Sequence, residues 1–217
     1  MNCLVTAGPT FEPLDNVRRL TNFSTGRLGS DLANFLAARG HDVTLLLGEQ
    51  STHAGEQKAR RVEKFTTTAD LRAKLQKLSE TGADAVFHAA AVSDFSFGKV
   101  WLRSAAGELT EVTSGKYSTR HGTLVAELVP TPKIISELRG WFPDAKIVGW
   151  KFEVDGSPEG VIQKAEDQLT DCGTDACVAN GPAYGSGFGL VTGVEHCTHL
   201  KDAAALCAAL EKFITKP

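Results

Sequence analysis

Short apolar runs alternate along the chain with segments in which apolar residues recur at helical spacing, the pattern of a parallel α/β sheet. The runs that predict buried strands cover residues 2–7, 41–47, 61–65, 83–90, 145–151 and 176–180. The first and last predicted helices cover residues 26–39 and 201–214. Three more lie between them: one is capped by Thr68 and ends near Gly82, one has Thr131 as N-cap and Pro132 as its first residue, and one begins at Ser157. We therefore expect a Rossmann-like, doubly wound and mostly parallel sheet.

This alternation breaks between Val100 and Leu128, where short β-like pieces are separated by glycines. The change predicts an inserted antiparallel β-ribbon. The chain has no internal repeat, no low-complexity stretch and no linker long enough to separate independent units. We expect residues 1–217 to form a single domain.

The connection between the first strand and the first helix, residues 8–26, is far longer than the usual 2–6 or so residues. It follows the carboxyl end of a strand, where open α/β sheets place their ligands. Its last residues bring the hydroxyls of Ser24 and Thr25, free backbone N–H groups and the helix dipole together, which suits an anion. The nearby Arg18 and Arg19 favour that interpretation. The alternative is that Ser24 and Thr25 only cap the helix and that Gly26 eases the turn.

Composition narrows the class of protein. Apolar residues make up 42% of the chain and charged residues 23%, ordinary values that exclude a disordered or fibrous chain. A net charge of −3 argues against wrapping nucleic acid, which needs a basic face. There is no run of about 18 apolar residues and no signal-like N-terminus, so we expect no membrane span. Five cysteines, an odd number, predict reduced thiols and a cytoplasmic protein.

Five motifs in fixed order carry a family resemblance over essentially the whole chain. They read VTAGPT, EPLD, VR and TNFSTG within residues 5–26, AAAVSDF at 89–95, GKYS at 115–118, VGWKFE at 148–153, and VAN at 178–180 followed by GFG at 187–189. Together they resemble the phosphopantothenoylcysteine synthetase (phosphopantothenate–cysteine ligase) family. The resemblance implies an amide-forming ligase of coenzyme A biosynthesis, acting on 4′-phosphopantothenate and L-cysteine through an acyl-nucleotide intermediate. It also implies CTP or ATP as co-substrate, Mg²⁺ or Mn²⁺, and a homodimer in which the ribbon is a candidate arm.

The resemblance, together with the long first loop, gives the expected site. Asn22 matches the asparagine that holds the acyl intermediate, Arg18 an arginine that meets the substrate phosphate, and Lys116 the lysine that reaches the nucleotide phosphates. The expected catalytic residues are Asn22 and Lys116; the nucleotide-binding residues are Gly8, Ala89, Ala90, Asp94, Lys116, Pro132, Lys133, Trp150 and Lys164; the substrate-binding residues are Arg18, Asn22, Ser24, Thr25, Gly26 and Ala90; and the metal ligand is Asp94.

Two departures from the family pattern leave the choice of nucleotide open. Bacterial members often carry a second lysine one turn beyond the position of Lys164, where this chain has Gln168 beside Asp167. The motifs around Lys116 and Lys151 are closer to the eukaryotic branch, which is associated with ATP, whereas most bacterial members are associated with CTP. The flavin-dependent decarboxylase half of many bacterial members is not in this sequence, so we expect the stand-alone form.

Three other functions compete with the ligase. An NAD(P)-dependent reductase or epimerase shares a similar first turn and strand end, but no G-x-G-x-x-G precedes the first helix, and neither Tyr117 nor Tyr184 has a lysine four residues on. A catalytically inactive, nucleotide-binding homologue is the second alternative. A metal-binding module is the third, although its candidate ligands lack typical zinc spacing. Those ligands are Cys172, Cys177, His196, Cys197 and His199.

Overall fold

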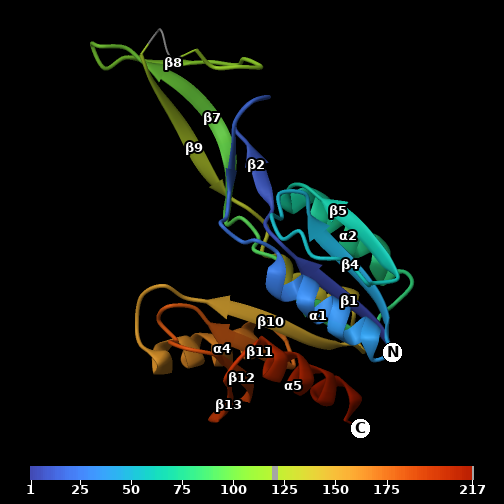
Figure 1. Cartoon of the computed structure of the whole chain (residues 1–217). Helices are drawn as coiled ribbons and strands as arrows, with labels where there is room; N and C mark the ends of the chain where they lie inside the picture. Colours follow the sequence, from blue (N-terminus) through green and yellow to red (C-terminus); the bar gives the residue numbers. More distant parts are fainter. Residues whose placement is uncertain (119–121, 217) are drawn as a thin grey trace.

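The computed structural model describes residues 1–118 and 122–216, and its centre is an eight-stranded sheet (Figure 1). The parallel strands are β1 (Asn2–Ala7), β4 (Asp42–Gly48), β5 (Arg61–Phe65), β6 (Ala85–His88), β10 (Lys146–Phe152) and β11 (Ala176–Asn180). An antiparallel hairpin of β12 (Phe188–Gly193) and β13 (His196–Leu200) extends the sheet beyond β11. The order β13-β12-β11-β10-β6-β1-β4-β5 contains the doubly wound Rossmann arrangement. The predicted fold class is confirmed.

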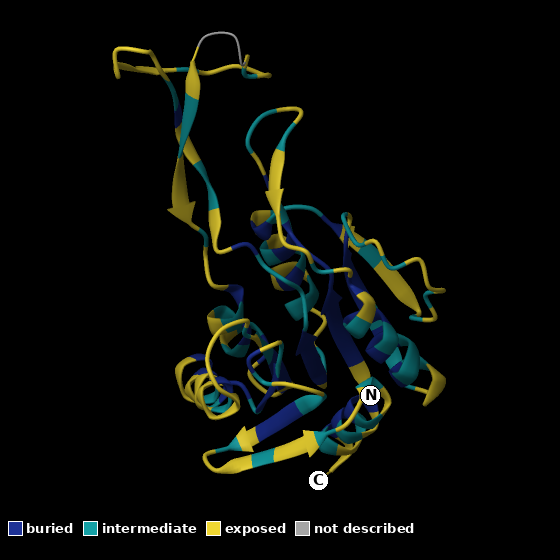
Figure 2. Ribbon diagram, turned by 60° about the vertical axis from the view of Figure 1, so that its left-hand side comes forward, coloured by how far each residue is buried: buried dark blue, intermediate teal, exposed yellow. Residues whose placement is uncertain are grey.

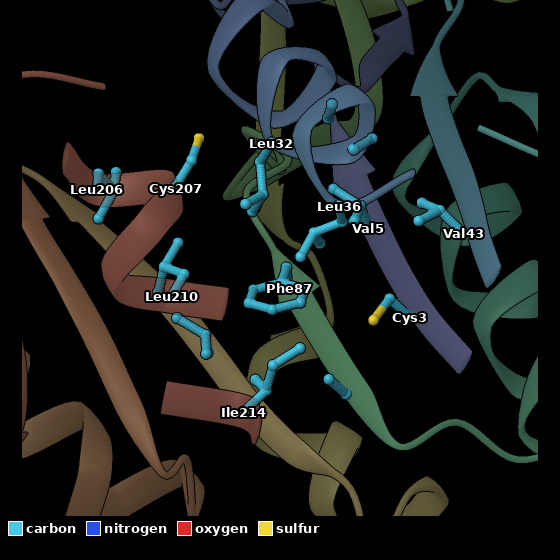
Figure 3. Packing of buried hydrophobic residues seen from close by; sticks show 14 of the residues in the cluster. Cys3, Val5, Leu32, Leu36, Val43, Phe87, Leu206, Cys207, Leu210 and Ile214 are labelled. Carbon is cyan, nitrogen blue, oxygen red and sulfur yellow. The ribbon is translucent and has the colours of Figure 1, made fainter. Parts of the chain in front are cut away.

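Helices cover both faces of this sheet. On one face α1 (Arg27–Ala38) and α5 (Ala203–Thr215) pack together; on the other lie α2 (Thr68–Ser79), α3 (Ile134–Trp141) and α4 (Pro158–Cys172). Figure 3 shows Phe87 of β6 surrounded by Leu32 and Leu36 of α1 and by Leu210 and Ile214 of α5. Phe87 is 0% exposed, and burying a side chain of this kind stabilises the fold by roughly 1.5–3 kcal/mol.

Two of the predicted helix starts are wrong, one by one residue and the other by two residues. The N-cap of α2 is Thr67, whose hydroxyl accepts from the Asp70 N–H, so Thr68 is already helical. The N-cap of α3 is Lys133 rather than Thr131. The Thr131 hydroxyl donates to the Ser93 carbonyl and its backbone N–H to the Asp94 carbonyl, so its side chain is directed to the loop after β6 and not to the start of the helix.

The predicted ribbon is present but longer than expected. It is built from β7 (Phe95–Arg103), β8 (Leu109–Glu111) and β9 (Thr123–Pro130), so it begins before Val100 and ends after Leu128. The extra residues of β7 pair with β9 around a register shift between Phe97 and Val100, and such a bulge interrupts the alternation that marks a strand in sequence. We call residues 95–118 and 122–130 the arm. Figure 2 shows it projecting from the buried sheet, with mostly exposed and half-exposed residues.

The long first loop contains a hairpin that was not predicted. Its strands are β2 (Phe11–Pro13) and β3 (Arg19–Thr21), and it lies beside β7 (Figure 1). The tip of the hairpin is hydrogen bonded to the arm, because the Asn16 N–H donates to the Gly115 carbonyl at 3.0 Å. The hairpin thus connects the sheet to the arm at a second point.

Candidate functional site

The largest cavity lies at the carboxyl ends of β1, β6, β10 and β11, and we call it the main cavity. Its volume is about 750 Å³, within the range of small-molecule sites. β1 and β6 are the neighbouring strands at which the sheet order reverses, and open α/β sheets bind ligands at that position. The cavity is lined by Gly8, residues 22–29, residues 89–92, Asp94, residues 150–153 and Asn180.

The start of α1 forms one wall of the main cavity. Gly26 is the N-cap, with φ of 79°, a left-handed conformation that strains any other residue, and no side chain caps the helix. Gly29 allows α1 to lie close to β1, since a Cβ there would be 2.6 Å from the Ala7 Cβ. Next to it, the Arg27 N–H donates to the Thr25 hydroxyl at 3.3 Å. Uncapped N–H groups at a helix start suit an anionic oxygen.

Asn22 joins the two loops that border the main cavity. Its Nδ2 donates to the Ala91 carbonyl at 3.1 Å, and the Ala91 N–H in turn donates to the Gly8 carbonyl at 3.0 Å. The loop after β6 is therefore fixed to the loop after β1. An amide nitrogen has two hydrogens, so Asn22 keeps a donor and an acceptor for a ligand after this bond is made.

A second cavity of about 300 Å³ opens beside the main cavity. The two share Ala90, Val92, Asp94, Trp150 and Lys151, so they form one continuous recess. The second cavity is further lined by His88, Ser93, Thr131, Pro132, Lys133, Ile134, Ile135 and Gln168. Within the described residues, the buried Nε1 of Trp150 has no hydrogen-bond partner. An N–H of this kind is a donor that a ligand can satisfy.

A third cavity, of about 190 Å³, adjoins the second and is surrounded by lysines. Lys133, Lys151 and Lys164 line it, together with Asp167, Gln168, Asp171 and Cys172. The Lys164 ammonium is 2.6 Å from the Glu153 carboxylate, which holds it at the junction of α4 and β10. The three adjoining cavities thus have the N-terminus of α1 at one end and a cluster of lysine side chains at the other.

The structure brings most of the expected site residues together, but not all. Gly8, Asn22, Ser24, Thr25, Gly26, Ala89, Ala90, Asp94 and Trp150 line the main cavity, Pro132 and Lys133 line the second, and Lys164 lines the third. Arg18 and Lys116 lie outside these three cavities, on the hairpin and on the arm. Their roles stay predictions.

Arg18 and the segment that carries Lys116 are connected through Asp15. The Arg18 guanidinium is 2.6 Å from the Asp15 carboxylate and also donates to the Tyr117 carbonyl at 2.8 Å. The hydrogen bond from the Arg18 guanidinium holds the pKa of Asp15 well below its usual range, and hydrogen bonds from the backbone N–H groups of Val17 and Tyr117 lower it further. Lys116 itself is exposed. The Asp15 carboxylate thus fixes the lysine-bearing segment against the hairpin.

Among the cavity-lining side chains that were not expected, four polar ones lie at the ends of sheet strands. They are His88, Lys151, Glu153 and Asn180. Each lies at or just after the carboxyl end of a parallel strand, and that position is the signal that could have identified them. The buried Oδ1 of Asn180 has no partner among the described residues.

The described residues do not build a metal site of their own. Across residues 1–118 and 122–216, no three His, Cys, Asp or Glu side chains are grouped so that they could hold a metal ion. Cys172 and Cys177, two ligands of the metal-module alternative, are buried, and burial raises the pKa of each thiol, to about 12 for Cys177. The exposed Asp94 fits a different kind of site, in which Mg²⁺ is held by one carboxylate and by phosphate oxygens.

The fold and the cavities define a Rossmann-like α/β protein with a ligand recess at the reversal point of its sheet. Residues 1–206 match the model of the DNA/pantothenate metabolism flavoprotein C-terminal domain. The chain belongs to this family. Within the described residues, no helix is long and apolar enough to cross a membrane.

Relatives and solved structures agree with this assignment. The chain is 36% identical over 184 residues to the coenzyme A biosynthesis bifunctional protein CoaBC of Thermococcus kodakarensis, covering 84% of this chain and 42% of that protein. It therefore spans less than half the length of this relative. The DNA/pantothenate metabolism flavoprotein from Streptococcus pneumoniae has the same fold, with a TM-score of 0.84 at 24% identity over 99% of this chain and 98% of that one. A mutant of Cab2 in complex with phosphopantothenate-cysteine gives a TM-score of 0.73 at 21% identity, over 98% and 87% of the two chains.

Proposed function

We propose that the chain is a phosphopantothenate–cysteine ligase that acts as one domain in coenzyme A biosynthesis. Family membership supports this proposal, as do the CoaBC relatives and the phosphopantothenate-cysteine bound to the Cab2 mutant. The observation that carries it is the convergence of Asn22, Ala90, Asp94 and Trp150, from three separate motifs, on one recess. The same membership favours the ligase over an NAD(P)-dependent reductase.

The proposed reaction has two steps because a carboxylate does not acylate an amine at neutral pH. First, a carboxylate oxygen of 4′-phosphopantothenate bonds to the α-phosphorus of the nucleotide and pyrophosphate leaves. Then the cysteine amine bonds to the acyl carbonyl carbon, the mononucleotide leaves with the electron pair of the broken C–O bond, and the amine loses a proton. The protein must therefore orient two anions and stabilise an oxyanion.

On this proposal the main cavity holds phosphopantothenate. Its phosphate accepts from the free N–H groups at the start of α1 and from the Ser24 and Thr25 hydroxyls. Asn22 binds the acyl group and donates to its carbonyl oxygen during attack by cysteine. The contact between Asn22 and the Ala91 carbonyl supports this role, because it fixes the amide before the substrate arrives.

The nucleotide would occupy the side of the recess formed by the loop after β6 and the start of α3. Gly8, Ala89 and Ala90 leave room for it, Trp150 contacts the nucleoside, and Asp94 binds the ribose or holds Mg²⁺. Pro132, Lys133 and Lys164 would contact the phosphates, where lysines supply positive charge. Mg²⁺, when bound, neutralises phosphate charge. CTP and ATP are both candidates.

The arm suggests that the enzyme is a homodimer. It carries Lys116 and places exposed apolar side chains on its strands, among them Leu109 at 56% and Leu128 at 50% exposure. A second copy that covers this surface would bury it and could bring Lys116 and Arg18 to a recess. We place the reaction in the cytoplasm, in keeping with five free cysteines.

The test is pyrophosphate release with 4′-phosphopantothenate, L-cysteine and Mg²⁺, using CTP and ATP in turn. We expect pyrophosphate in amounts that depend on phosphopantothenate, with one nucleotide clearly preferred. If neither CTP nor ATP gives pyrophosphate release that depends on phosphopantothenate, the proposed function is contradicted. NADPH binding detected by its fluorescence would instead revive the reductase alternative.

A further inference from the structure

One buried titratable side chain in the recess has no role in the function proposed above. His88 is the last residue of β6 and lines the second cavity, with 6% of its surface exposed. It lies beside Thr6 in the neighbouring strand β1, and the Thr6 hydroxyl is 2.9 Å from the His88 Nδ1. Both side chains therefore sit under the two loops that border the recess.

The hydrogen bonds around Thr6 determine which nitrogen of His88 carries the proton. The Thr6 Oγ1 accepts from the Ala90 N–H at 3.1 Å. Thr6 is 0% exposed, and within the described residues its hydroxyl hydrogen has one acceptor, the His88 Nδ1. Nδ1 is then unprotonated, so the neutral imidazole carries its hydrogen on Nε2. Burial lowers the pKa of His88 to about 4, so this neutral form persists at physiological pH.

The surroundings of His88 suit the base of a nucleotide rather than its phosphates. On this side the second cavity has Trp150 and the apolar Ile134 and Ile135, whereas Lys133 and Lys151 are shared with the lysine-lined third cavity. A flat, neutral ring stacks on aromatic and apolar side chains. A triphosphate is attracted to lysines.

We propose that the Nε2–H of His88 is a fixed hydrogen-bond donor to the nucleotide base, held in that tautomer by Thr6. The proposal rests on the proposed function, because it takes the second cavity to be the nucleotide site. The group that accepts is a ring nitrogen, which both cytosine and adenine present, or the carbonyl oxygen of cytosine. His88 is a binding and specificity residue on this account, and Thr6 is a positioning residue.

The test measures the dissociation constants of CTP and ATP for the full chain in Mg²⁺, by calorimetry. His88→Leu removes the donor, and loss of one hydrogen bond should weaken the better-bound nucleotide about tenfold. His88→Gln keeps an N–H at a similar reach and should bind within about threefold of wild type. His41→Leu is the matched control, since the His41 side chain is 9% exposed and pairs with Glu211 far from the recess. It should leave both constants unchanged.

A nitrogen NMR measurement on wild type keeps the proposal testable if His88→Leu does not fold. We expect His88 to show a protonated Nε2 and an unprotonated Nδ1, and the Nε2–H signal to shift when nucleotide binds. Thr6→Val should allow the two tautomers to mix and weaken binding by a few fold.

The outcomes separate the two levels of the account. A wild-type protein that binds neither CTP nor ATP contradicts the proposed function and this inference with it. A wild-type protein that binds nucleotide, with His88→Leu folded and equally tight, overturns only the role of His88. A proton on Nδ1, or an Nε2–H signal that does not change with nucleotide, overturns it as well.

Discussion

The central sheet and the arm are both made of β-strands, yet they use their apolar residues in opposite ways. Val5 and Phe87 in the sheet are 0% exposed, whereas Leu128 in the arm is 50% exposed and Phe95 at its base is 43% exposed. The sheet completes its own core with helices on both faces. The arm has no helix over it, so the same strand-forming residues there are free to contact a second molecule.

The candidate chemistry divides along the same line. The recess is built by loops at the carboxyl ends of sheet strands, and Asn22 is fixed there by the Ala91 carbonyl. Lys116 lies on the arm, held by contacts of Asp15 and Arg18 with Tyr117. The difference teaches that loops at the ends of the sheet strands form the recess, while the arm holds the charge of Lys116 outside the three cavities.

The largest expected effect is on the sheet side of the site. Asn22→Asp replaces a donor with a negative charge beside an anionic intermediate, and loss of an oxyanion donor costs on the order of 10²–10³ in kcat. We expect that loss in phosphopantothenate-dependent turnover, with nucleotide binding by calorimetry retained. Gln76→Glu, the same amide-to-acid change at an exposed position of α2, is the control and should turn over normally. Loss of nucleotide binding in Asn22→Asp would indicate a folding defect and contradict its role.

The next effect separates the two regions by stability. Phe87→Ala leaves a hole between α1 and α5 and should lower the free energy of unfolding by about 3–5 kcal/mol. Leu128→Ala on the arm should change it by no more than about 0.5 kcal/mol. Urea unfolding of both variants at equal concentration checks the comparison. Equal losses would show that the arm is part of the same core.

The free energy of unfolding should also depend on pH through His88 in the central sheet, with an effect of similar size. His88 in the unfolded chain binds a proton near pH 6.5, but in the folded protein its pKa is about 4 because of burial. Between these values the unfolded state binds more protons, so stability falls as the pH is lowered from 6.5 to 4, by up to about 3 kcal/mol. Unfolding curves across this range should show the loss in wild type. His88→Gln should lack that component, and an identical pH profile would contradict it.

The smallest effect on stability, and the sharpest test of the arm, comes from Leu128→Asp. A charge on an exposed strand changes the folding free energy of the subunit by about 0.5 kcal/mol or less. It should nevertheless weaken a dimer formed through the arm, because an unpaired charge is costly to bury. Sedimentation velocity should give a larger monomer fraction than wild type. An unchanged sedimentation profile would rule this strand out as the dimer contact.

Sequence pattern was sufficient for the parallel strands because most of them, unlike β5, are nearly continuous apolar runs. The strands β5 (Arg61–Phe65) and β11 (Ala176–Asn180) have the predicted limits, and the alternation with helices predicted that most strands are parallel. The hairpin of β2 and β3 was missed because each strand has three residues and most of them are exposed. Short exposed strands have no apolar face for a pattern to reveal.

The sequence could predict the parts of the candidate site that lie at strand ends. It could not predict the parts that depend on how distant segments are placed in space. Motif matches predicted that Asn22 and Ala90 share a site, and both line the main cavity, because the loops that carry them follow the neighbouring parallel strands β1 and β6. The predicted ribbon already contained Lys116, but the motif matches could not show that this lysine lies outside the three cavities. His88 was missed because its hydrogen-bonding state is set by Thr6, which is 82 residues away in sequence.

The most direct test of the central claim is to trap the acyl nucleotide. Wild-type protein is incubated with 4′-phosphopantothenate, Mg²⁺ and the preferred nucleotide in the absence of cysteine, and the products are resolved by mass spectrometry. We predict the mass of a phosphopantothenoyl nucleotide, with one pyrophosphate for each molecule formed, and its conversion to phosphopantothenoylcysteine when cysteine is added. Nucleotide consumption that does not depend on phosphopantothenate, or no acyl nucleotide with either CTP or ATP, would contradict the account.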